Sequence, residues 1–189
     1  MTPPYDPLNP DGRTRDSDES KGHGESGPSE KGRHRPDAPF VIWLDADAAP
    51  RPVREMVFRA AQRLDLPAVL VANHRLSLPP GNSLVTQVLV SPGDDVADRH
   101  IARHSRQGDL AITADIPLAA ELVEHGVHVL DPGGERYTAE NVGERLSIRD
   151  FMASLRDSGV ETGGPSAYGP GRRKAFGDAL DRTLTELLR

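Results

Sequence analysis

The chain has 189 residues, a formal net charge of −6 and no cysteine. Its length suits one domain with an appendage, because a single core of ordinary size needs roughly 100 to 200 residues. The lack of cysteine excludes disulfides, thiolate ligands and a thiol nucleophile, so any chemistry must come from oxygen or nitrogen groups. The negative charge disfavours non-specific adhesion to nucleic acid, which would need a local basic patch.

The first 38 residues differ in composition from the rest. They are rich in Pro, Gly, Ser and charges, and Tyr5 and Leu8 are almost their only large apolar residues. Such a segment cannot bury enough apolar surface to offset the entropy of ordering it. We therefore predict a disordered tail over residues 1–38 and one domain over residues 39–189.

No part of the chain suggests a membrane protein. No stretch approaches the ~18 consecutive apolar residues of a membrane span, and the N-terminus lacks the basic start and apolar run of a signal peptide. We expect a cytoplasmic protein with no membrane partner.

From Phe40 onward, short β-rich runs alternate with helical patterns, as in βα units around a mostly parallel sheet. The runs predict strands over 40–45, 68–72, 84–90, 110–113 and 127–130. Helices are predicted over 50–64, over 94–104, after Thr113 to about His125, over 138–158 with an interruption near Ser147, and over 172–188. The pattern indicates a three-layer α/β fold, with helices flanking a sheet of strand order about 3-2-1-4-5.

Acidic residues recur where the predicted strands end. The first strand ends in Asp45-Ala-Asp47, the helix after the third strand opens with Asp95 and Asp98, and the fourth strand leads to Asp115. In open parallel sheets, sites form beyond the carboxyl ends of the strands, at the crevice where the strand order reverses. The predicted order places strands one and four side by side there, so we expect these carboxylates to face each other.

Clustered carboxylates repel each other, which raises some of their pKa values unless a cation joins them. Mg²⁺ or Mn²⁺ suits such hard oxygen ligands, and either ion can activate water and neutralise charge on a phosphoryl group. A single Asp-x-Asp is weak evidence, because acids are common in loops and helix caps. Recurrence at three strand ends favours a metal site, with Asp45, Asp95, Asp98 and Asp115 as the predicted ligands.

Several segments also resemble the bacterial YaiI/YqxD family, in the same order along the chain. The resemblance covers residues 40–188 and implies a PIN-like fold. PIN domains are typically Mg²⁺- or Mn²⁺-dependent ribonucleases, so the resemblance makes RNA a candidate partner. The segments that carry it are Ile42–Pro50, Val71–Leu76, Gly93–Asp98, Gly108–Ala119, Glu144–Asp150 and Thr162–Pro165.

The resemblance also implies which acids are catalytic. The three acidic motifs of the family fall on Asp45 and Asp47, on Asp95 and Asp98, and on Asp115. Two neighbouring positions depart from the family pattern. Asp94 has no counterpart in the motif, and Ala49 stands where the family commonly has cysteine, so any catalytic or redox role of that cysteine is lost.

Two polar residues near the acids have alternative interpretations. Thr113 could hold a carboxylate or a metal-bound water through its hydroxyl group, or it could be an ordinary β-branched strand residue. Asn73, at the end of the second predicted strand, could hydrogen-bond a phosphate or the turn at Asp45, or serve as a plain turn residue.

Basic residues offer candidate substrate contacts. Arg145 and Arg149 lie one helical turn apart and could hold a substrate phosphate or pair with Glu144 and Asp150. A basic patch of Arg172, Arg173 and Lys174 opens the last predicted helix, where the helix dipole disfavours cations, so an anionic partner is expected nearby. In contrast, His100 and His104 have the spacing of a metal pair but lack a third nitrogen ligand, which favours a solvated helix face.

Three functions compete. The leading one is a metal-dependent hydrolase acting on phosphodiesters, most naturally RNA, in which Asp47 supports the metal or the attacking water. A phosphatase of the HAD type would use Asp45 as nucleophile, Asp47 as general acid and Thr113 as a second motif, but its acidic pair should follow the threonine and not precede it. A non-catalytic module that binds RNA or protein, with a structural ion, is the third.

Overall fold

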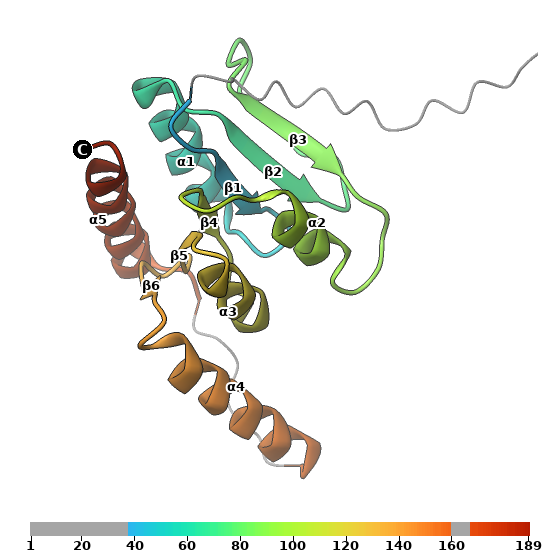
Figure 1. Ribbon diagram of the computed structural model, residues 1–189. Helices are drawn as coiled ribbons and strands as arrows, with labels where there is room; N and C mark the ends of the chain where they lie inside the picture. Colours follow the sequence, from blue (N-terminus) through green and yellow to red (C-terminus); the bar gives the residue numbers. More distant parts are fainter. Residues whose placement is uncertain (1–37, 160–166) are drawn as a thin grey trace, which may run out of the picture.

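A computed structural model describes residues 38–159 and 167–189. Within them, six strands form one sheet in the order β3-β2-β1-β4-β5-β6 (Figure 1). The predicted tail, apart from Ala38, and the Thr162–Pro165 segment lie outside the described residues. The strands are β1 (Ile42–Asp45), β2 (Ala68–Ala72), β3 (Val85–Leu89), β4 (Leu110–Ile112), β5 (His128–Leu130) and β6 (Arg136–Tyr137).

The first five strands run parallel, which confirms the predicted α/β class and the order 3-2-1-4-5. β1 is central, with Ile42 opposite Ala68 of β2 on one side and Leu110 of β4 on the other. All four residues of β1 are buried, as expected of a parallel strand covered on both faces. The carboxyl ends of β1 and β4 therefore meet at one edge of the sheet.

The sixth strand, β6, was not predicted. It has only two residues and pairs antiparallel with β5, which is too short a run to show an alternating pattern. The connection requires a glycine, because Gly134 has a φ of +94° and a Cβ there would lie 2.6 Å from the backbone carbonyl of Ala175. β6 thus covers the edge of β5.

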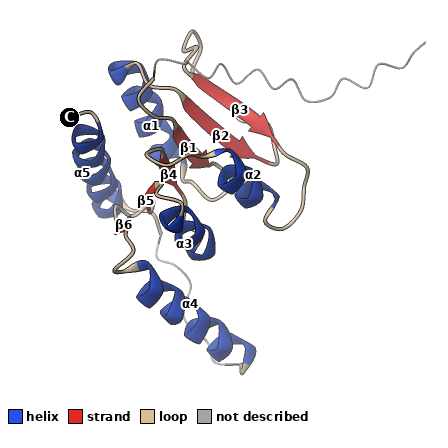
Figure 2. Ribbon diagram, viewed as in Figure 1, coloured by secondary structure: helices blue, strands red, loops and turns tan. Residues whose placement is uncertain are grey.

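Helices cover both faces of the sheet (Figures 1 and 2). One apolar cluster packs α1 and α5 against the sheet, and a second cluster packs α2 and α3 against the opposite face. No helix within the described ranges is long and apolar enough to cross a membrane. The bounds are α1 (Arg51–Leu64), α2 (Val96–His104), α3 (Ile116–Glu124), α4 (Val142–Asp157) and α5 (Pro170–Leu187).

The predicted interruption near Ser147 is wrong, because α4 is continuous. The Ser147 hydroxyl donates to the Gly143 carbonyl one turn earlier, 3.0 Å away, so this polar residue fits inside the helix. The helix begins later than predicted, at Val142. Before it, Asn141 forms a turn by accepting from the Thr138 backbone N–H at 2.8 Å.

A buried carboxylate fixes the start of β1. Asp109 accepts hydrogen bonds from the Val41 backbone N–H, the Trp43 indole Nε1 and the Arg106 backbone N–H, each 2.9 Å long. Buried charges persist only where donors surround them, and three donors meet that condition here. Asp109 precedes β4, so this anchor lies at the amino edge of the sheet, opposite the end that carries the acids.

Candidate functional site

β1 delivers the first two acids to the carboxyl edge of the sheet. Asp45 is the last residue of the strand and is only 5% exposed. Asp47 follows in an exposed turn, where its Oδ2 accepts from the Asn73 backbone N–H at 3.0 Å and its Oδ1 lies 3.0 Å from His74 Nδ1. Asn73 therefore contacts the turn after β1 through its backbone N–H and not through its side chain, so the role of that side chain stays a prediction.

The end of β4 holds two further residues of the site. The Thr113 hydroxyl donates to Asp45 Oδ2 at 3.1 Å, and Thr113 Oγ1 accepts from the Asp115 backbone N–H at 3.0 Å. Asp115 in turn caps α3, because its Oδ1 accepts from the Leu118 backbone N–H at 2.7 Å. Thr113 thus holds a carboxylate, and it links the two strand ends.

The start of α2 brings the third pair of acids. Asp95 precedes the helix and has a φ of 56°, a left-handed backbone conformation that residues other than glycine rarely adopt. Asp98 lies in the first turn and is half-buried. Asp94, next to them, is exposed, and its carbonyl oxygen accepts from Arg99 at 3.3 Å.

All five predicted acids line one open pocket of about 350 Å³. They come from three segments that are far apart in the sequence: the end of β1, the start of α2 and the loop between β4 and α3. Thr113 and Asn73 lie behind this lining, where they hold Asp45 and Asp47. The full lining consists of Asp45, Asp47, Ala48, Gly93, Asp95, Val96, Ala97, Asp98, Ala114 and Asp115.

Burial and mutual repulsion disturb the ionisation of two of these acids. Burial raises the pKa of Asp45, and the charges of Asp47 and Asp115 add to this, although the Thr113 hydrogen bond opposes it. Burial also raises the pKa of Asp98 to about 6, with further contributions from Asp115, Asp45 and Asp95. Asp45 and Asp98 therefore both carry a raised pKa within one pocket lined by carboxylates.

The donor set suits a hard, hydrated cation. Every polar side chain in the pocket lining is a carboxylate, and oxygen ligands favour Mg²⁺ or Mn²⁺. In the part of the chain that the structure describes, no three His, Asp or Glu side chains are grouped so as to enclose a metal ion by themselves. Mg²⁺ commonly takes only one or two carboxylates and keeps several waters, so binding of this ion would not require such a group.

The arginines of α4 make ion pairs. Arg145 lies 2.7 Å from Glu135, which the β5–β6 hairpin brings close, and Arg149 lies 2.8 Å from Asp150. Both arginines are exposed. The hydrogen bond to Asp150 raises the pKa of Arg149, and the charge of Asp115 makes a smaller contribution in the same direction.

The three predicted cations at the start of α5 have different surroundings. Lys174 pairs with Asp178 one turn later, at 2.5 Å. Arg172 lies over the Tyr168 ring, 5.8 Å from its centroid, and its charge lowers the pKa of Asp131, which burial raises overall. Arg173 is exposed. None of the three lines the carboxylate pocket.

The two histidines with the spacing of a metal pair, for which a solvated helix face was favoured, do not line the pocket. The rings of His100 and His104 stack at 4.0 Å, and His100 is tilted against Trp43 at 6.4 Å. His104 is exposed as expected, whereas His100 is half-buried.

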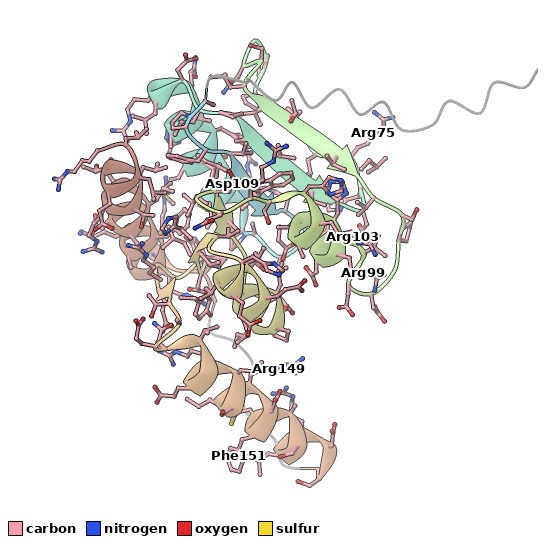
Figure 3. All side chains as sticks on the ribbon, viewed as in Figure 1. Arg75, Arg99, Arg103, Asp109, Arg149 and Phe151 are labelled. Carbon is pink, nitrogen blue, oxygen red and sulfur yellow. The ribbon has the colours of Figure 1, made fainter. Side chains whose placement is uncertain are left out.

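Sequence reasoning did not consider several charged residues outside the pocket lining as candidates. Asp131 follows β5, so the rule that pointed to the other strand ends could have found it, but its Oδ1 accepts from the Gly133 backbone N–H in a tight turn. Three exposed arginines were also missed. Arg75 comes directly after Asn73 and His74, the two residues that contact Asp47. Arg99 and Arg103 lie one turn apart on α2, after Asp98 in the sequence (Figure 3).

Fold and pocket together define a mostly parallel α/β protein with a carboxylate-lined site at the carboxyl edge of its sheet. The chain belongs to the YaiI/YqxD family: residues 43–186 match the family described as "Uncharacterized BCR, YaiI/YqxD family".

Full-length relatives agree. A UPF0178 protein from Myxococcus xanthus is 58% identical over 148 residues, which cover 78% of this chain and 96% of the relative. One from Bordetella avium is 53% identical over 143 residues, which cover 76% and 92%. One from a Shewanella species, strain MR-7, is 49% identical over 150 residues, which cover 79% and 98%.

Proposed function

We propose that this protein is a metal-dependent hydrolase of phosphodiesters, with RNA as its substrate. One observation carries the proposal: Asp45, Asp98 and Asp115 converge in one pocket, where burial and repulsion raise the pKa of two of them. Burying like charges together destabilises a fold, and a divalent cation relieves that cost. The PIN-like resemblance and the family membership are consistent with this chemistry.

Each acid has a distinct part in the proposed reaction. Asp45, Asp98 and Asp115 would hold Mg²⁺ or Mn²⁺, one or two of them directly and the others through metal-bound waters, with Asp95 in the lining of the same pocket. When bound, the ion would supply an activated water and neutralise charge on the phosphoryl group. Asp47 is positioned by Asn73 and His74 to accept a hydrogen bond from the attacking water.

Thr113 serves as a positioning residue. Its hydroxyl donates to Asp45 and accepts from the Asp115 backbone, so it fixes the relative placement of two predicted ligands. No side-chain nucleophile is required in this scheme, because water attacks the phosphorus.

Exposed arginines are the candidate substrate contacts. Arg99 follows Asp98 on α2, Arg75 follows His74 in the sequence, and the charge of Asp115 influences Arg149. In Figure 3, Arg75, Arg99 and Arg103 project from the side that carries β3 and α2, and Arg149 projects from α4. Cations placed around a metal site suit a substrate with several phosphates, whose backbone they would hold.

Cleavage of a labelled single-stranded RNA in the presence of Mn²⁺ or Mg²⁺ tests the proposal. The parent should cut the RNA, the chelated protein should not, and Asp45→Asn should lose most of the activity. Asp94→Asn is the matched control, because Asp94 is exposed and does not line the pocket. Release of phosphate from small monoesters through a phosphorylated Asp45 would instead support the phosphatase, and RNA binding without cleavage would support a non-catalytic module.

Salt dependence of RNA binding locates the substrate contacts without relying on cleavage. Each lost phosphate contact should flatten the slope of log affinity against log salt by about 0.7 for a single strand. Replacing Arg75, Arg99 and Arg103 by Gln together should make this salt dependence shallower. The cations of α5 give the comparison: if they are the principal contacts, replacing Arg172, Arg173 and Lys174 should have the larger effect.

A further inference from the structure

Three arginines of α4 lie along one side of the helix. Arg145, Arg149 and Arg156 keep within about 40° of one another around the helix axis, because α-helices turn once every 3.6 residues. We call these residues the α4 arginine stripe. The acids of α4 fall outside this sector; they are Glu144, Asp150 and Asp157.

The stripe lies on the side of α4 that packs against the domain. Val142 shares this side, within about 60° of each arginine, and it is buried in the cluster that packs α2 and α3 on the sheet. α3 is the element that α4 contacts most. In Figure 3, Arg149 and Phe151 leave α4 in different directions. The stripe therefore runs outward along α4 from the face of the domain that carries α2 and α3, and the segments at the starts of these two helices supply acids of the pocket.

All three arginines are accessible. The side chains of Arg145 and Arg149 are 45% and 48% exposed, and Arg156 is also exposed. Exposed ion pairs contribute little stability, so a phosphate can take the place of the carboxylates that Arg145 and Arg149 contact. Arg156 makes no ion pair within the described ranges. The stripe can therefore exchange its present contacts for an anionic ligand.

We infer that the α4 arginine stripe holds the phosphate backbone of an RNA strand that extends beyond the carboxylate pocket. A guanidinium donates paired hydrogen bonds to a phosphate, and a row of cations on a chain of net charge −6 gives a polyanion a local place to bind. Arg145 and Arg156 are roughly 16 Å apart along the helix axis, which is long enough for several phosphates of one strand. The inference takes its ligand from the proposed function and adds that the substrate is an extended strand.

Salt dependence of RNA binding in chelator tests the stripe without cleavage. Fluorescence anisotropy compares the parent with a stripe variant that carries Arg145→Gln, Arg149→Gln and Arg156→Gln, using a labelled single strand of about 16 nucleotides. Each lost phosphate contact should flatten the slope of log affinity against log salt by about 0.7, so the stripe variant should be shallower by about 2. Arg156→Gln alone should flatten the slope by about 0.7, and this change disrupts no ion pair within the described ranges.

A matched control removes the same charge from the other side of the protein. Arg59→Gln, Arg182→Gln and Arg189→Gln replace exposed arginines of α1 and of the α5 segment, and these helices cover the sheet face opposite α2 and α3. This control variant should keep the slope of the parent. Circular dichroism verifies that each variant is folded.

Two results overturn the inference. A stripe variant with the slope of the parent shows that the three arginines do not contact RNA, and a control variant that changes as much as the stripe variant reduces the effect to net charge. Cleavage reports separately on the proposed function. If the parent binds RNA through the stripe but does not cut it with Mg²⁺ or Mn²⁺, the proposed hydrolase fails and the stripe stands. If the parent cuts RNA and the stripe variant keeps the slope of the parent, the hydrolase stands and the inference fails.

Discussion

Asp98 provides the most direct test of the carboxylate pocket. Burial and three neighbouring carboxylates raise its pKa from the ordinary value of 3.8 to about 6. Each pKa unit corresponds to ~1.4 kcal/mol, so the full difference gives a ceiling of ~3 kcal/mol. Because the side chain is only half-buried, solvent screening reduces the expected cost of its charge to ~1–2 kcal/mol.

The sign follows from proton binding. Between the unfolded pKa near 3.8 and the folded pKa near 6, the folded state binds more protons than the unfolded state, so stability falls as the pH rises. In metal-free buffer the parent should therefore lose ~1–2 kcal/mol between about pH 4 and pH 7. Asp98→Asn removes the ionisation. It should be more stable than the parent at pH 7 by that amount and close to it at pH 4.

Urea denaturation across this pH range, with chelator present, measures both quantities. Asp94→Asn, a neighbouring acid outside the pocket, should leave the pH dependence unchanged. Adding Mg²⁺ or Mn²⁺ at about 100 times the dissociation constant should stabilise the parent by ~2.7 kcal/mol and Asp98→Asn by much less. An Asn variant that is less stable than the parent at pH 7, or equally displaced from it at every pH, would refute the repulsion argument.

Three further substitutions test other parts of the fold. Thr113→Val should destabilise the protein by ~1–3 kcal/mol and weaken metal binding, because it leaves the part-buried N–H of Asp115 unpaired and removes a hydrogen bond to Asp45. Thr113→Ser should retain both the stability and the metal binding, as measured by calorimetry. Asp109→Ala should cost ~3 kcal/mol or more by orphaning three donors, and the fluorescence of Trp43, the single tryptophan, should report the change directly. Gly134→Ala should lower the melting temperature, because its Cβ would meet the α5 backbone at 2.6 Å.

The convergence of the acids could be predicted because it follows from topology. Parallel strands present all their carboxyl ends at one edge, so acids at the ends of β1 and β4 had to be neighbours once the strand order was known. The bounds of β2 could also be predicted, because Ala68–Ala72 is a continuous apolar run. Thr113 lies at the end of β4, so the same strand order made a contact with a carboxylate one of its two interpretations.

Other features depend on contacts that a sequence pattern does not contain. Arg145 pairs with Glu135 and not with Glu144, because the short β6 strand folds the chain back beside α4. The half-buried position of His100 depends on where α2 crosses β1, which brings Trp43 against it. Exposed arginines such as Arg75 give no periodic signal that would single them out in the sequence.

The anchoring of β1 limits how this chain can vary in length. Asp109 accepts hydrogen bonds from Val41 and Trp43 at one end of the strand, and Thr113 donates one to Asp45 at the other end. Asp109 and Thr113 both belong to the β4 segment. The spacing between the two contacts is therefore four residues in each segment, from Val41 to Asp45 and from Asp109 to Thr113. A single-residue insertion or deletion between the two contacts of either segment would separate Asp45 from the Thr113 hydroxyl, whereas surface loops elsewhere tolerate added length better. We therefore expect length changes in homologous chains to avoid these two segments.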